Sequence, residues 1–404
     1  MFKRVLSVSL VALLVAGLMV AFGIAQEKVL TVITPWSGAE LEVFQPVLDA
    51  AEAELGIEIE HLTYRAEDLA PLLPAQFAAK TAPGDVIFMW AWFIAEKAKE
   101  GHIMEVTDVI DEADFSPGVL DPVKVDDKLY GAAYTGKVKP GFWYRKSFFA
   151  AHGLTEPTNW LEFVELVEKI KGIGGIKNPI VSGDGVGWPL SDVTEHFLVA
   201  FGGPELHKEL AACLCVPWWW SVIKAIINNW LSGLFIKEGY FSEPIEWTTA
   251  LELWWEGDYG LYFMGSWITA MVEDPDDLGV FPIPGTMGLV FAADYAFIPA
   301  YTQYPDDAKA LLQFLATKGQ EIQVQQGGHI ATYLPVSLDL YPPVDREVAE
   351  TMVGKVALLD LDDTIGGEFQ MVFWDQLKLL WVAPERCSEV VDAIHEAYDE
   401  ACGC

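Results

Sequence analysis

The sequence VLTVIT at residues 29–34 is a short apolar run that predicts a buried β-strand. Two similar runs follow it, IEIEHL at residues 57–62 and DVIFM at residues 85–89. Between these runs, apolar residues recur at spacings of three and four, which predicts helices over residues 41–55 and 68–80. Because strands that alternate with helices form parallel sheets through right-handed crossovers, this part of the chain predicts an α/β fold.

The rest of the chain continues with strands and helices in a less regular order. We expect a loop over residues 172–187, which are rich in glycine and proline, and mainly helices from about residue 190 to residue 256. Strands are expected at residues 142–144, 260–263, 279–283 and 289–298, and helices at residues 160–171, 305–318 and 391–401. No low-complexity linker divides the chain, which indicates two lobes between which the chain crosses more than once.

The composition excludes several classes of protein. The 404 residues include 25 lysine and arginine residues against 59 aspartate and glutamate residues, a formal net charge of −34. Nucleic acids and anionic lipids bind clustered basic charge, so neither is expected as a partner. Hydrophobic residues make up 52% of the chain, which excludes a disordered acidic segment and suits about two or three domains. Tryptophan also outnumbers tyrosine, 16 residues against 13, which composition alone does not explain.

The N-terminus has the three parts of a secretory signal. Lys3 and Arg4 form a basic start, an uncharged run extends over residues 5–25, and the run ends in the small-x-small sequence Gly23-Ile24-Ala25. The run is also about as long as a membrane-spanning helix. Cleavage after Ala25 and retention as a membrane anchor are therefore both open, and cleavage is the preferred alternative. Either way, we expect an exported protein at the periplasmic or extracellular face of the cell membrane.

Five cysteines are present, Cys213, Cys215, Cys387, Cys402 and Cys404. Export permits a disulfide, for example between one of the Cys213 and Cys215 pair and a C-terminal cysteine. The odd number leaves at least one thiol unpaired. Neither C-x-C pair has the C-x-x-C spacing of zinc or thioredoxin-type sites, so buried or bridged cysteines are the preferred interpretation.

Several segments, in order along the chain, resemble a known family. They are KLYGAAY at residues 128–134, FWYRK at 142–146, GLTEPTNW at 153–160, GDYG at 257–260, MGSW at 264–267, FPIPG at 281–285 and the helix-like segment 304–315. Together they resemble the extracellular solute-binding proteins of ABC importers, in particular the sugar-binding, maltose-binding-protein-like type. The chain departs from this pattern at Arg145, where the family usually has asparagine, in the run Trp218–Trp220 and in the Cys213 and Cys215 pair.

The resemblance implies an α/β fold of two lobes, the type II periplasmic-binding-protein-like fold, with a mainly parallel sheet flanked by helices in each lobe. Lobe 1 would comprise residues 27–134 and 278–331, and lobe 2 residues 135–277 and 332–404. A mono- or oligosaccharide would bind in the interlobe cleft, and hinge closure would prepare its delivery to the membrane subunits of an ABC permease. The implied protein is a monomer without catalytic activity, cofactor or metal.

Tryptophans at predicted loop positions are the first candidates for ligand contacts. They are Trp36, Trp90, Trp92, Trp188 and Trp267, with Gly265 beside the last. Ligands of open α/β sheets bind beyond the carboxyl ends of the strands, where Trp36, Trp90 and Trp92 are expected. Trp267 lies at an inferred crossing between the lobes, and Trp188 follows the glycine-rich stretch. An indole offers a wide apolar face for the C–H face of a pyranose and one N–H donor for a hydroxyl.

The other tryptophans are interpreted differently. Those on predicted helices, Trp160, Trp247, Trp254 and Trp255, are expected to pack in the core. The run Trp218–Trp220 fits neither group.

Polar candidates for the rim of a sugar are Glu40, Arg65, Glu195, Asp294 and His329. Structural alternatives exist: Glu40 can serve as a first-turn charge of a helix, and Arg65 can pair with a local acid. Asp294 stands near a crossing where the resembled family often contacts sugar, but it can also bond turn amides. A lone histidine such as His329 is more often structural.

Three other functions stay open. A polyamine is a second ligand hypothesis, because an acidic aromatic cleft suits a cation. A secreted glycoside hydrolase would need two positioned carboxylates, and no G-x-S-x-G, H-E-x-x-H or P-loop motif occurs. The seven histidines and the lack of spaced His and Cys ligands disfavour a metal chelate. Sugar binding is therefore the preferred hypothesis.

Overall fold

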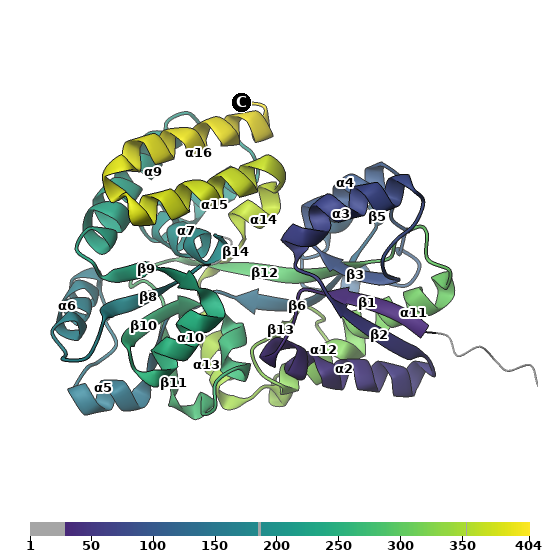
Figure 1. Cartoon of the computed structure of the whole chain (residues 1–404), viewed down its shortest axis with the longest axis horizontal. Coiled ribbons are helices and arrows are strands. Elements are labelled where there is room, and N and C mark those ends of the chain that lie inside the picture. The colour runs from purple at the N-terminus through teal and green to yellow at the C-terminus, as the bar shows by residue number, and fades with distance from the viewer. Residues whose placement is uncertain (1–28, 185–186, 353) are drawn as a thin grey trace, which may run out of the picture.

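The computed structural model describes residues 29–184, 187–352 and 354–404. The predicted signal or anchor over residues 1–25 lies outside the described residues. Within the described part of the chain, no helix has both the length and the apolar character that a membrane crossing needs. Figure 1 shows two lobes side by side, each with a central sheet and helices around it.

Lobe 1 is built on a seven-stranded sheet in the order β13-β6-β12-β3-β1-β2, with β14 paired to β12. Strands β1, β2 and β3 are parallel, as the alternation of strands and helices predicts. The strands are β1 (Val29–Thr34), β2 (Glu58–Thr63), β3 (Val86–Met89), β6 (Ala132–Val138), β12 (Gly288–Phe297), β13 (Ile330–Ala331) and β14 (Val356–Leu359). The main helices are α2 (Ala39–Leu55), α3 (Ala66–Ala78), α4 (Ala91–Lys99), α11 (Pro305–Phe314) and α12 (Gln320–Gln325).

Lobe 2 is built on a five-stranded sheet in the order β11-β7-β10-β8-β9. Its strands are β7 (Gly141–Arg145), β8 (Asn178–Asp184), β9 (Phe241–Glu246), β10 (Tyr259–Met264) and β11 (Leu278–Phe281). Its helices are α5 (Lys146–His152), α6 (Trp160–Lys171), α7 (Trp188–Gly202), α8 (Pro204–Ala211), α9 (Trp219–Ile226), α10 (Trp247–Glu256), α13 (Pro343–Thr351), α14 (Leu361–Ile365), α15 (Gly367–Val382) and α16 (Cys387–Cys402).

The α/β fold in two lobes is confirmed, but three details differ from the prediction. Both sheets are mixed rather than mainly parallel, because β12 is antiparallel to β3 and β6, and β7 is antiparallel to β10 and β11. Strand β8 lies where a loop was expected, and β9 where helices were expected. Strand β8 is buried on both faces between β10 and β9, so it shows no alternation, and its sequence NPIVSGD lacks the long apolar run of most such strands.

Strand pairing also differs from the predicted lobe boundaries at two points. Strand β11 (Leu278–Phe281) begins at the residue where lobe 1 was expected to resume, yet it pairs with β7 in the sheet of lobe 2. Strand β14 (Val356–Leu359) was expected in lobe 2, yet it pairs with β12 in the sheet of lobe 1. The chain therefore passes from one lobe to the other after β6, after β11, after β13, and both before and after β14.

Disulfides fasten the C-terminus to the segment between α8 and α9. Cys213 is bonded to Cys402 and Cys215 to Cys404, with Cα atoms 5.1 and 5.4 Å apart, while Cys387 is a buried free thiol. A bridge from the Cys213 and Cys215 pair to the C-terminus, one alternative read from the sequence, is thus present twice.

The tryptophan run beside these disulfides has a packing role in part. Trp220 stacks on His395 of α16, with ring centroids 4.3 Å apart. Trp219 donates its indole N–H to Glu209 of α8, whereas Trp218 is 59% exposed. Two of the three rings therefore connect α9 to the helices that the disulfides join.

Candidate ligand-binding cleft

A cleft between the lobes is lined by residues that follow strands of both sheets. Trp36 follows β1, Trp90 follows β3, and Glu246 ends β9. The volume of the cleft is about 1360 Å³, above the roughly 300–1,000 Å³ of most small-molecule sites. Its position agrees with the rule that open α/β sheets bind ligands beyond the carboxyl ends of their strands.

Most of the predicted site residues line this cleft. They are Trp36, Glu40, Arg65, Trp90, Trp92, Trp188, Trp267 and Asp294. Gly265 stands behind Trp267, where a Cβ atom would overlap the indole ring. His329 lines a small pocket behind Trp36 and Trp267, and its Nδ1 lies 2.8 Å from Thr135 Oγ1. Burial lowers the pKa of His329 well below its ordinary value, so it is a neutral structural residue here.

Glu195 does not reach the cleft, contrary to the prediction. It is fully buried on α7, with its Oε2 atom 2.7 Å from His207 Nε2 and accepting from the backbone N–H of Leu361. Burial raises the pKa of Glu195 well above its ordinary value and lowers the pKa of His207 to about 4. The two groups therefore form a neutral buried pair, which fastens α7 to the start of α14.

Trp36 and Trp267 are more enclosed than the prediction of ligand plates suggests. They are 4% and 7% exposed. The ammonium group of Lys137 lies over both rings, 5.6 Å from the centroid of Trp36 and 5.4 Å from that of Trp267, and forms an ion pair with Asp294 at 3.2 Å. A cation of the protein itself therefore occupies the space beside these two rings.

A second aromatic group, on the lobe 2 side, includes a tryptophan that was not predicted to belong to the site. Trp188, Trp247 and Trp267 form a cluster with ring centroids 5.6 to 6.4 Å apart. Trp247 and Trp255 were assigned to core packing, yet both line the cleft and are only partly buried. Trp247 begins α10 directly after β9, so the undetected strand concealed its loop-like position.

Glu246 is a further cleft residue that the sequence did not single out. Its Oε2 atom accepts from the backbone N–H groups of Thr248 and Thr249, both at 3.0 Å, and so caps α10. Burial opposes ionisation, but these bonds outweigh it and lower the pKa of Glu246. Its Oε1 atom is buried and has no hydrogen-bond partner among the described residues. Glu246 is therefore a fixed, ionised group in the wall of the cleft, adjacent in sequence to Trp247.

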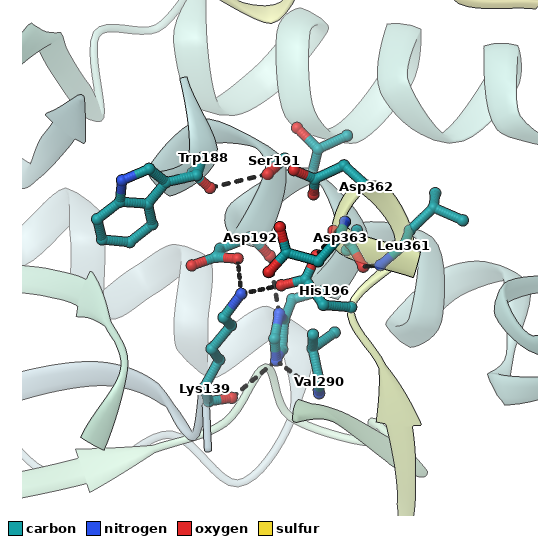
Figure 2. A network of polar contacts seen from close by, with 12 residues as sticks. Lys139, Trp188, Ser191, Asp192, His196, Val290, Leu361, Asp362 and Asp363 are labelled. Atoms are coloured by element: carbon teal, nitrogen blue, oxygen red, sulfur yellow. Dashed lines mark hydrogen bonds and ion pairs between the residues drawn. The ribbon is translucent and has the colours of Figure 1, made fainter. Parts of the chain in front are cut away.

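Helix α7 fastens the crossing segments of the hinge. Lys139, just after β6, forms ion pairs with Asp192 of α7 and with Asp360, just after β14 (Figure 2). The Nε2 atom of His196 lies 2.8 Å from the carbonyl oxygen of Lys139 and 3.4 Å from the backbone nitrogen of Val290 in β12. Helix α7 thus contacts the segments after β6 and β14 as well as β12.

Carboxylates near Lys139 also have the spacing of possible metal ligands. Asp192, Glu195 and Asp360 form one such group, and Asp360, Asp362 and Asp363 form another. Burial disfavours ionisation of Asp360, but the charge of Lys139 outweighs this effect and lowers the pKa of Asp360. Burial raises the pKa of Asp192 to about 7 despite the same lysine. Lys139 thus supplies the positive charge that these buried carboxylates need.

Asp345 supports the Trp267 segment from behind and predicts a pH dependence of stability. Its Oδ1 atom accepts from Thr269 Oγ1 at 2.8 Å and from the N–H of Gly328 at 2.9 Å. Burial raises its pKa to about 6, whereas an unfolded aspartate titrates near 3.9. Between these values the folded protein holds the proton more tightly, so this group should cost about 3 kcal/mol of stability as pH rises from about 4 to above 6.

Urea unfolding at pH 4 and pH 6.5 tests this dependence. Asp345→Asn should remove the corresponding part of the slope, because the amide does not ionise. Asp339→Asn, an exposed position nearby, is the control and should leave the slope unchanged. An Asp345→Asn variant with the pH dependence of the original chain would contradict the assignment.

The fold and the cleft define the class of protein. Two mixed α/β lobes joined by several crossing segments, with an aromatic cleft between them, are the architecture of periplasmic solute-binding proteins. The chain belongs to the bacterial extracellular solute-binding protein family, whose model matches residues 36–322. The resemblance read from the sequence is thereby confirmed.

Individual relatives agree with this assignment. The chain is 53% identical to an ABC transporter extracellular-binding protein of Pyrococcus horikoshii, over 91% of this chain and 88% of the relative. It is 24% identical to the osmoprotective compounds-binding protein GgtB of Synechocystis sp., over 85% and 86% of the two chains.

Solved structures show the same fold. A chitin oligosaccharide binding protein matches with a TM-score of 0.79 and 20% identity, over 94% of this chain and all (100%) of that one. Maltose-bound MalE3 of T. maritima matches with a TM-score of 0.74 and 19% identity, over 92% and 98% of the two chains.

Proposed function

We propose that this solute-binding protein captures a mono- or oligosaccharide in the interlobe cleft and delivers it to an ABC permease. It acts as a monomer at the periplasmic or extracellular face of the membrane, by hinge closure and without catalysis. The observation that carries the proposal is the lining of the cleft, which combines tryptophans from both lobes with carboxylates and an arginine. Indole faces suit the C–H faces of pyranoses, and the charged groups and indole N–H groups suit their hydroxyls.

The position of Lys137 disfavours a polyamine, relative to a neutral sugar, beside the rings of Trp36 and Trp267. An aromatic box for a cation needs its centre free, but Lys137 already lies over Trp36 and Trp267. An added ammonium group would meet this fixed positive charge. Two structural neighbours are a chitin oligosaccharide binding protein and a maltose-bound protein, which agrees with the same ligand class here.

The carboxylates of the cleft also support a binding role over hydrolysis. Asp294 is engaged in an ion pair with Lys137, and Glu246 caps a helix. A glycosidase needs one carboxylic acid and one carboxylate free to act on either side of a glycosidic bond. Incubation of the purified protein with labelled oligosaccharides should therefore yield no cleavage products, and turnover would contradict the proposal.

Calorimetry against neutral oligosaccharides, polyamines and peptides tests the ligand class. We expect binding of a neutral sugar, such as a malto- or chito-oligosaccharide. Polyamine binding without any sugar response would refute the proposal.

Trp247→Ala tests the cleft itself. The substitution removes an indole ring that lines the lobe 2 side of the cleft. It should weaken the affinity for sugar by at least about tenfold, a loss of about 1.4 kcal/mol in binding free energy. Trp218→Ala is the matched control, because Trp218 is 59% exposed and does not line the cleft. Equal affinities of the two variants would contradict the assignment of Trp247 to the site.

A further inference from the structure

The lobes meet on the cleft wall where Trp92 of α4 faces Gly366, which lies between α14 and α15. A Cβ atom on Gly366 would lie 2.6 Å from Trp92 Cδ2 and closer still to Cγ and Cδ1. These distances are well inside the 3.5–4.0 Å optimum for carbon atoms. The indole therefore rests directly on the backbone of Gly366, and any side chain at this position would occupy the space of the ring.

The lobe 1 side of this contact is a rigid aromatic pair. Trp90 and Trp92 are stacked, with ring centroids 5.7 Å apart and an interplanar angle of 16°. Trp92 also packs edge-on against Phe93, which is buried in the core of lobe 1. The ring of Trp92 cannot move aside without disturbing this stack.

The lobe 2 side is equally constrained. The N–H of Gly366 donates to the carbonyl oxygen of Asp362 at 2.8 Å, which fixes the backbone at the end of α14. Trp374 of α15 is 1% exposed, donates its indole N–H to Asp362 and meets Trp90 at a centroid distance of 6.2 Å. Two rigid surfaces thus touch without an intervening flexible side chain.

We propose that Gly366 is the residue that allows the lobes to close fully, and that the seat of Trp92 on Gly366 sets the closing angle of this binding protein. The contact consists of protein atoms alone, so no ligand atom takes part in it. A ligand can only shift an equilibrium between arrangements that the protein can reach. A side chain at position 366 removes the fully closed arrangement from that equilibrium, and the apparent affinity falls with the fraction of competent protein.

A neighbouring glycine provides a matched control. Gly366 has φ = 67° and ψ = −160°, a conformation essentially restricted to glycine, and Gly367 has φ = 59°, so alanine is strained at both positions. A Cβ atom on Gly367, however, would have no atom within 4 Å. Gly366→Ala and Gly367→Ala therefore differ in the contact with Trp92 and in backbone strain, and a substitution of Trp92 separates the two effects.

Small-angle X-ray scattering of the free protein is the primary test. Gly366→Ala should increase the radius of gyration relative to the original chain, and Gly367→Ala should leave it unchanged. Trp92→Ala in the Gly366→Ala background should restore the original value, since alanine has no Cγ or Cδ1 atom in the space of the new methyl group. Equal radii for Gly366→Ala and Gly367→Ala, or no restoration by Trp92→Ala, would overturn the proposal.

The affinity measurement separates this proposal from the proposed function. With maltotriose and chitotriose as probes, Gly366→Ala should bind at least tenfold more weakly than Gly367→Ala. If the original chain binds neither sugar, the proposed ligand class is in doubt, while the scattering comparison still decides on the closing contact. If both glycine variants bind a sugar equally well, the sugar proposal stands and the closing contact is refuted.

Discussion

Removing both disulfides is expected to lower the free energy of unfolding by about 5 kcal/mol, whereas removing either one alone should lower it far less. Cys213–Cys402 and Cys215–Cys404 each join residues 189 positions apart. A disulfide stabilises mainly by restricting the unfolded chain, and a loop of this length is near the upper end of that effect. The second disulfide closes almost the same loop, so it adds little once the first has formed.

The folded state should tolerate the loss of both bonds. Helix α16 keeps its apolar face buried through Val390, Val391, Ile394 and Tyr398, so it stays packed against lobe 2 without covalent attachment. The expected loss therefore appears in the unfolding equilibrium rather than in the native structure.

Chemical unfolding of four proteins measures this effect: the original chain, Cys213→Ser/Cys402→Ser, Cys215→Ser/Cys404→Ser, and the variant with all four serines. The cysteine Cys387 is left in place, since it is buried and unpaired. Two single-bridge losses that add up to the loss in the four-serine variant would contradict the shared-loop explanation. A four-serine variant as stable as the original chain would contradict the stabilising role altogether.

The fold of lobe 1 could be predicted from the sequence because its elements carry strong local signals. The strand VLTVIT begins and ends as predicted at Val29 and Thr34, and its neighbours β2 and β3 are displaced by about one residue. Helix α6 is also placed correctly, because Asn159 caps it and Phe163, Val167 and Ile170 share its buried face.

The missed strands of lobe 2 show where local signals end. Strand β8, with the sequence NPIVSGD, owes its conformation to parallel neighbours on both sides rather than to its own composition. Strand β9 contains Pro244 and follows a helical region, so its sequence favours no strand. Tertiary pairing decided both, and no window of a single sequence contains that information.

Residues of the candidate site could be predicted only where the strand before them carries a strong local signal. Trp36, Trp90 and Trp92 could be placed at the cleft because the strands before them were recognised. Glu246 and Trp247 could not, because they lie at the end of β9, which was not recognised. Glu195 was misplaced for another reason: a carboxylate inside a helix carries no sequence signal for whether it faces a ligand or a buried histidine.

Lys139→Met is expected to destabilise the protein by about 3–5 kcal/mol at neutral pH. The side chain of Lys139 is 5% exposed, and those of its partners Asp192 and Asp360 are 2% and 5% exposed. Burial alone would lower the pKa of Lys139, but the charges of Asp192 and Asp360 raise it well above its ordinary value, so the lysine is charged. Removing it leaves buried carboxylates without their cation, and that desolvation is no longer offset.

The pH dependence of the loss distinguishes charge from packing. Without Lys139, the folded-state pKa of Asp360 must rise above the unfolded value near 3.9, and that of Asp192, already about 7, must rise further. Acids with raised folded-state pKa values cost stability as pH increases, so the penalty should be small near pH 4 and should grow toward pH 7. A packing defect would give the same loss at both pH values.

Unfolding measurements at pH 4 and pH 7 on three proteins complete the test. Adding Asp192→Asn and Asp360→Asn to Lys139→Met should recover much of the stability at pH 7, because the neutral amides need no cation. No recovery, or an Lys139→Met variant as stable as the original chain at pH 7, would show that the ion pairs contribute nothing to the hinge. The expected recovery would instead show that Lys139, placed just after β6, neutralises the buried carboxylates Asp192 of α7 and Asp360 after β14. The positive charge of this lysine then allows the two segments to pack together.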